Sequence, residues 1–118
     1  MAAESVLRTK CDEFAVRIVN CYKFLNKVKK ENILSKQLLR SGTSIGANVT
    51  EGIYAQSRND FISKLSISLK EAQETSYWLR LLYKSDYIGE NEFTSIHHDN
   101  EEIIKLLMAT IKSTKSTE

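Results

Sequence analysis

Apolar residues recur every three or four positions along most of the chain, which is the spacing of one buried face of an α-helix. The first series consists of Leu7, Cys11, Phe14, Ile18, Tyr22, Leu25 and Val28. It predicts a helix over about residues 4–29, because a strand would alternate apolar and polar residues instead. A short polar turn, Lys29-Lys30-Glu31-Asn32, follows this helix.

The second apolar series keeps a helical phase across two glycines. It consists of Leu34, Leu38, Ile45, Val49 and Ile53, with Gly42 and Gly46 inside it. Each glycine costs a helix about 1 kcal/mol relative to alanine, so a loop that splits the segment is one interpretation. The unbroken phase favours the other, a continuous helix that is bent at the glycines and packs closely against a neighbour.

A third helix is predicted over about residues 58–85. Ser57 and Asp60 have the spacing of a capping box just before it. One face carries Phe61, Leu65, Leu69, Ala72, Ser76, Leu79 and Tyr83. Four further apolar residues, Ile62, Trp78, Leu81 and Leu82, make this face wide enough to touch two neighbours or a second subunit, and they exceed what one bundle face should need. We therefore expect a homo-oligomer.

The turn Ser85-Asp86-Tyr87-Ile88-Gly89 separates this helix from a fourth, predicted over about residues 90–112. Its apolar face consists of Phe93, Ile96, Ile103, Leu107 and Ile111. Residues 113–118 have no apolar anchor and are expected to form a frayed tail. Four long helices joined by short turns predict an all-α fold, an antiparallel up-down-up-down four-helix bundle over residues 1–112.

The composition fits one domain with an ordinary core. The chain has 118 residues, a formal net charge of +2, two cysteines and no proline. The N-terminal residues lack the apolar stretch of a signal peptide, and no apolar run approaches the 18 or so residues of a membrane span. We therefore expect a cytoplasmic protein without a membrane partner.

The residues that most often carry catalysis or metals are sparse. Cys11 and Cys21 lie ten positions apart on one predicted helix, about 15 Å, which is too far for a disulfide, so both are expected in the core. The two histidines, His97 and His98, fall in an acidic segment without the Glu-x-x-His pairs of a di-metal bundle. The Gly42-x-x-x-Gly46 spacing lacks the Lys-Ser/Thr of a phosphate loop. We expect no catalytic residue, metal or cofactor.

Charge is distributed unevenly along the chain. Residues 23–40 contain six basic groups and one acidic group, Glu31, whereas residues 86–104 contain six acidic groups and no basic one. The candidate nucleic-acid-binding residues are Lys27, Lys29, Lys30, Lys36 and Arg40. A basic corner of this kind binds RNA or DNA, meets an acidic protein surface, or is only a solvated turn, and the sequence leaves all three open.

The run over residues 37–52, Gln-Leu-Leu-Arg-Ser-Gly-Thr-Ser-Ile-Gly-Ala-Asn-Val-Thr-Glu-Gly, resembles the bacterial four-helix-bundle family of 23S rRNA intervening-sequence proteins. The resemblance continues in Arg58, Phe61, Ser68-Leu69-Lys70-Glu71 and Tyr87-Ile88. It implies a bundle that associates into a ring, often a pentamer. It also implies kinship to the accessory protein of diversity-generating retroelements, a basic ring that binds nucleic acid and a reverse transcriptase. This chain lacks the proline that relatives often have in the first turn or near Gly46.

Four residues of this run are expected to form a structural seam: Gly42, Gly46, Asn48 and Glu51. The glycines would admit a neighbouring helix, and the polar pair, if buried, needs partners such as Arg40, Arg58 or Ser68. The sequence thus predicts a non-enzymatic, oligomeric helical-bundle protein with possible RNA association. The alternatives are a protein-binding scaffold and, third, a metal- or small-molecule-binding bundle.

Overall fold

The computed structural model describes residues 2–117, with side chains from Glu4 onward, and contains four α-helices. They are α1 (Ala2–Lys27), α2 (Leu34–Ile53), α3 (Arg58–Lys84) and α4 (Glu90–Ser116). Each helix packs on two neighbours, α1 and α3 both lying against α2 and α4. The predicted up-down-up-down bundle is confirmed, and it measures 48 × 22 × 19 Å.

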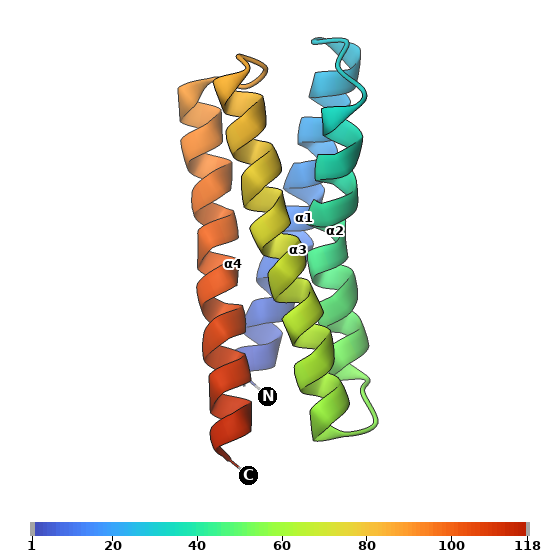
Figure 1. Cartoon of the computed structure of the whole chain (residues 1–118), viewed down its shortest axis with the longest axis vertical. Helices are drawn as coiled ribbons and strands as arrows, with labels where there is room; N and C mark the ends of the chain where they lie inside the picture. The colour runs from blue at the N-terminus through green and yellow to red at the C-terminus, as the bar shows by residue number, and fades with distance from the viewer. Residues whose placement is uncertain (1, 118) are drawn as a thin grey trace.

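The antiparallel order places both the α1–α2 turn and the α3–α4 turn at one end of the bundle (Figure 1). The α2–α3 turn and both chain ends lie at the other. Segments rich in lysine and in carboxylates, which are far apart in the sequence, therefore share one end of the molecule. Among residues 2–117, no helix combines the length and the apolarity needed to cross a membrane.

The core follows the predicted apolar faces. Its large, fully buried side chains are Leu7, Phe14, Ile18, Leu25, Leu38, Ile45, Leu65, Leu79, Leu82, Ile96, Ile103 and Leu107. Cys11 and Cys21 are buried free thiols, as expected. Val28 is an exception, being 63% exposed because α1 ends at Lys27 and the valine falls in the turn.

The segment with the two glycines forms one continuous helix, α2. The interpretation with a loop is therefore wrong. The predicted N-terminus of α3 is confirmed, since the Ser57 hydroxyl accepts a hydrogen bond from the Asp60 amide at 3.1 Å.

Two expectations about the later helices need correction. Leu82, expected to widen the apolar face of α3 toward two neighbours or a second subunit, is completely buried in the bundle, so it serves the neighbouring helices and is not available to a second subunit. Helix α4 continues to Ser116 rather than ending near residue 112. Its last turns include Thr110 and Thr114, whose hydroxyls donate to carbonyls four residues back, both at 2.7 Å. Glu118 lies outside the described residues.

Candidate nucleic-acid interface

The α1–α2 turn reverses the chain within a few residues. The amides of Val28 and Lys29 both donate to the Phe24 carbonyl, at 2.9 and 3.4 Å, and the Glu31 amide donates to the Leu25 carbonyl at 2.9 Å. Lys30 adopts a left-handed backbone conformation, with φ at 59°. This tight geometry leaves the side chains of Lys29 and Lys30 exposed on the outside of the turn.

Glu31 faces the opposite way, toward the start of α2. Its carboxylate accepts hydrogen bonds from the amides of Ile33, Leu34 and Ser35 at 3.0, 2.9 and 2.7 Å, and the Ser35 hydroxyl donates to the Glu31 carbonyl. The amides at a helix N-terminus have no partners within the helix and carry partial positive charge, so a carboxylate there is stabilising. Burial acts to raise the pKa of Glu31, but these hydrogen bonds outweigh it and lower the pKa.

Four lysines surround this turn and remain exposed: Lys27, Lys29, Lys30 and Lys36. We call them the lysine cluster. Within residues 4–117, none of the four forms an ion pair with a carboxylate. The ammonium group of Lys29 lies 5.9 Å from the centre of the Phe24 ring. The cluster is therefore a cationic surface, and Glu31, the one acidic residue among these lysines in the sequence, is engaged with backbone amides.

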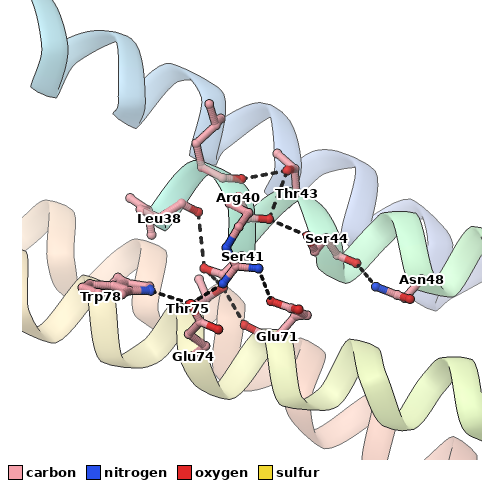
Figure 2. Close-up of polar contacts among 11 residues, drawn as sticks. Leu38, Arg40, Ser41, Thr43, Ser44, Asn48, Glu71, Glu74, Thr75 and Trp78 are labelled. Atoms are coloured by element: carbon pink, nitrogen blue, oxygen red, sulfur yellow. Dashed lines mark hydrogen bonds and ion pairs between the residues drawn. The ribbon is translucent and has the colours of Figure 1, made fainter. Parts of the chain in front are cut away.

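Arg40, the fifth candidate, does not join the lysine cluster. Its guanidinium group binds Glu71 of α3 at 3.2 Å and also pairs with Glu74, whose carboxylate accepts a hydrogen bond from the Trp78 indole at 2.9 Å (Figure 2). The hydrogen bonds from Arg40 and then Trp78 lower the pKa of Glu74. Arg40 thus connects α2 to α3, and its charge is already compensated.

Buried hydroxyl groups lie beside the ion pairs of Arg40 in the α2–α3 interface. Those of Ser41 and Thr75 hydrogen-bond to each other at 2.9 Å (Figure 2). Farther along, the Ser68 hydroxyl donates to the Ile45 carbonyl at 2.8 Å. Ser41, Thr75 and Ser68 are fully buried, so these bonds satisfy polar groups that would otherwise cost stability. They fix the register of α2 on α3.

The expected glycine seam lies on the other side of α2, against α1. A Cβ atom on Gly42 would lie 2.8 Å from Cγ1 of Ile18, and one on Gly46 would lie 3.3 Å from Cβ of Cys11. The polar pair does not occupy this seam. Asn48 donates to the Ser44 carbonyl of its own helix at 2.9 Å, and exposed Glu51 pairs with Lys64 at 3.2 Å. Arg58 and Ser68 are not their partners.

The acidic segment pairs mainly with α1. Arg17 binds Asp99 at 2.8 Å and Glu92 at 3.4 Å, and Lys10 pairs with Glu102 at 3.9 Å. Three carboxylates of this acidic segment are therefore already paired with cations of α1, whereas the four lysines of the cluster pair with no carboxylate within residues 4–117.

The two histidines of this segment differ in their surroundings. His98 is largely exposed, whereas His97 is half-buried, with Nε2 3.3 Å from the Ser76 hydroxyl and its ring 5.0 Å from that of Phe93. Each lies within 4 Å of the glutamate four positions later. The part of the chain that the structure describes contains no group of three His, Cys, Asp or Glu side chains able to hold a metal ion. Burial raises the pKa of Cys11 to about 12 and that of Cys21 to about 11, so both thiols are neutral at physiological pH.

The profile of one protein family, described as 23S rRNA-intervening sequence protein, matches residues 4–109. The chain belongs to this family. The match extends into all four helices and ends within α4, so membership applies to the bundle and not to the central run alone. No curated protein sequence matches the chain.

A solved structure supports the same assignment. A protein of unknown function from the S23 ribosomal protein family of Bacteroides thetaiotaomicron VPI-5482 has a crystal structure that superposes with a TM-score of 0.92. The two sequences are 57% identical, and the similarity covers 93% of this chain and 98% of that one. The fold of this member of the 23S rRNA-intervening sequence protein family is therefore shared with an experimentally determined relative.

The runs that carry the family resemblance meet in the folded protein. Arg40 and Ser41 of α2 contact Glu71 and Thr75 of α3, and Ser68 contacts the backbone of Ile45. Much of the recognisable pattern of the family therefore encodes how two helices pack. Arg40 lies near the lysines along the chain, and this proximity predicted a shared role in nucleic-acid binding. The two glutamates of α3 that bind its guanidinium group are 31 and 34 positions later, and no local signal in the sequence indicates them.

Proposed function

We propose that this chain is a non-enzymatic, self-associating helical bundle that binds nucleic acid through the lysine cluster. The observation that carries the proposal is which charged side chains of the α1–α2 turn face the solvent and which face the helix. Lys27, Lys29, Lys30 and Lys36 are exposed and unpaired with carboxylates, while the carboxylate of Glu31 is buried against the start of α2. Exposed cations without internal partners are suited to phosphate groups, whose counterions they release.

Self-association would strengthen this binding. In the ring that the family resemblance implies, with five copies as the expected number, each copy would present one cluster. Several weak contacts on one strand then act together. Kinship to the retroelement accessory protein, which the resemblance also implies, points to the same kind of partner.

The outer surface of α3 supports the self-association. Tyr77 is 49% exposed and the neighbouring Trp78 and Leu81 are half-buried, while Ile67, about three turns earlier on the same helix, is 40% exposed. Apolar side chains gathered on one helix commonly mark an interface. The same surface would serve a protein-binding scaffold, which is the second candidate function.

The test is the salt dependence of RNA binding, measured by fluorescence anisotropy with a labelled single strand. Each phosphate contact contributes a slope of about −0.7 in the logarithm of the binding constant against the logarithm of salt concentration. Replacing Lys29, Lys30 and Lys36 with glutamine should weaken binding and flatten this slope. The matched control replaces Lys105, Lys112 and Lys115, three exposed lysines of α4, and should leave the slope nearly unchanged.

Two results decide against the proposal. Equal effects of the two triple variants would mean that only net charge matters and that the lysine cluster has no special role. If the wild-type protein retains no RNA or DNA at about 50 mM salt, where electrostatic binding is strong, the scaffold function is the better one.

A further inference from the structure

A cavity of about 590 Å³ lies at the lysine-rich end of the bundle, between the second half of α1 and the α3–α4 turn. Helix α1 contributes Arg17, Asn20, Cys21 and Phe24 to its wall, and the turn contributes Tyr87 and Gly89 among others. This volume is in the range of sites that hold small organic ligands, about 300–1,000 Å³. Lys29 also lines the cavity, so the cavity opens directly beside the lysine cluster.

The cavity offers aromatic and apolar surfaces to a flat ligand. Phe24 is 42% exposed, so its ring is accessible at the wall of the cavity, and Tyr87 lies half-buried on the turn. Cys21 and Ile88 add buried apolar surface, and the Cys21 thiol is neutral because burial raises its pKa to about 11. Rings of this kind stack on nucleobases without regard to sequence.

The charges of the lining give no net attraction for an anionic ligand inside the cavity. Arg17 is held by Glu92 and Asp99, at 3.4 and 2.8 Å, which leaves its positive charge compensated. Two cations, Arg17 and Lys29, and two carboxylates, Asp86 and Glu92, line the wall, so the lining carries no excess positive charge that would draw a phosphate or carboxylate inside. A neutral group suits the interior, and the Asn20 amide and the Asp86 carboxylate can hydrogen-bond to the edges of such a group.

We infer that this cavity accepts an unpaired base of a single-stranded nucleic acid whose backbone phosphates lie on the lysine cluster. The inference rests on the proposed function and adds to it a preference for single-stranded over duplex nucleic acid. Lys29 is the link, because it belongs to the cluster and lines the cavity, placing a phosphate site next to a base site. A duplex keeps its bases stacked inside, so it can use the lysines but not the cavity.

The experiment compares a single-stranded RNA of about 12 nucleotides with the corresponding duplex, by fluorescence anisotropy at about 50 mM salt. The wild-type protein should prefer the single strand. Phe24→Leu and Tyr87→Leu should each reduce single-strand affinity by roughly tenfold while leaving duplex affinity unchanged, since base stacking is lost and the lysines remain. Phe24→Leu keeps an apolar side chain at a partly exposed position, so the fold survives this change even if Tyr87→Leu perturbs the turn.

Tyr54→Leu is the matched control, because Tyr54 is 73% exposed and immediately follows α2 at the opposite end of the bundle. If the protein binds RNA through the lysines but Phe24→Leu, Tyr87→Leu and wild type bind the single strand equally, the cavity inference is wrong and the proposed function stands. If neither RNA is retained, the proposed function fails, and the uncharged nucleoside adenosine then tests the cavity alone. Shifts of the Ile88 and Gly89 amide signals with adenosine would mean that the cavity binds a free nucleoside, which overturns the inference of a nucleic-acid strand. No shifts would exclude a base as the ligand.

Discussion

Gly42 of α2 lies directly against Ile18 of α1. A Cβ atom at position 42 would come within 2.8 Å of Cγ1 and 2.9 Å of Cγ2 of Ile18, a side chain that is completely buried and has no free space to enter. The absence of a side chain at position 42 therefore sets how closely α1 and α2 approach at this point.

Gly42→Ala should destabilise the bundle by about 1–3 kcal/mol, the usual cost of overpacking, despite the higher helix propensity of alanine. Gly46→Ala is the matched comparison, because its nearest contact is 3.3 Å, to Cβ of Cys11. We expect it to be close to neutral, since alanine's propensity offsets a small shift. Urea denaturation of both variants checks this, and a stable Gly42→Ala variant would mean that α1 and α2 are farther apart than described.

The sequence alone predicts most of the fold and less of the candidate interface. Apolar spacing placed all four helices, because a helix of 20 or more residues repeats its buried face many times. The wrong predictions concern residues whose surroundings are set by tertiary contacts. Leu82 is one of them, because its burial depends on how α3 packs on its neighbouring helices. The same holds for Arg40 and Glu74, which lie 34 positions apart and are brought together only by the α2–α3 packing.

The role of Glu31 shows a subtler limit. Its place in a lysine-rich turn suggests a surface carboxylate, and nothing in the apolar pattern indicates that it faces three backbone amides instead. One signal was present in the sequence, because no Ser, Thr, Asp or Asn directly precedes Leu34, and α2 therefore needs its cap from elsewhere.

Glu31→Gln should lower the stability of the protein at neutral pH by roughly 1 kcal/mol, because an amide oxygen caps a helix less well than a carboxylate. The pKa of Glu31 is lower in the folded state than in the unfolded chain. Its contribution to stability is therefore fully present above the ordinary glutamate pKa of the unfolded chain and is lost as the pH falls through the lower pKa of the folded state. Unfolding measured between pH 7 and acid conditions should show the two proteins converging at the lowest pH.

Glu13→Gln serves as the control for this experiment, since Glu13 is exposed on α1. It should match the wild type at each pH. A constant difference between wild type and Glu31→Gln down to the lowest pH would show that the carboxylate charge is not what stabilises α2.

Asp86 follows the C-cap of α3 in a left-handed backbone conformation, which glycine usually supplies at the ends of helices. Its φ is 68°, its amide donates to the Tyr83 carbonyl at 3.1 Å, and the next amide, that of Tyr87, donates to the Leu82 carbonyl at 2.9 Å. This is the hydrogen-bond pattern of a Schellman cap. Asp86→Gly should therefore raise the melting temperature, by an amount corresponding to about 0.5–1 kcal/mol, since glycine adopts this conformation without strain.

Ser85→Gly is the comparison for that variant, because Ser85 has a φ of −95° that any residue adopts. Here glycine only adds entropy to the unfolded chain, so the melting temperature should fall. Opposite shifts of the two neighbouring variants, measured by circular dichroism, would establish that backbone conformation and not loss of a side chain is responsible.

Assembly is the remaining prediction. The outer face of α3 presents Ile67, Tyr77, Trp78 and Leu81, and we expect another copy of the chain to cover it. Light scattering should then give a mass well above that of one chain. For a ring of five copies, the mass should be five times that of one chain. Ile67→Glu combined with Tyr77→Glu should dissociate the oligomer, because a charge cannot be buried there without a partner. Val16→Glu is the matched control, since Val16 is 62% exposed on α1, the helix that does not contact α3 within the described residues. A monomeric wild-type protein contradicts the prediction outright. Dissociation by the control and not by the α3 variant would move the interface to α1 and leave the exposed residues of α3 for a different protein partner.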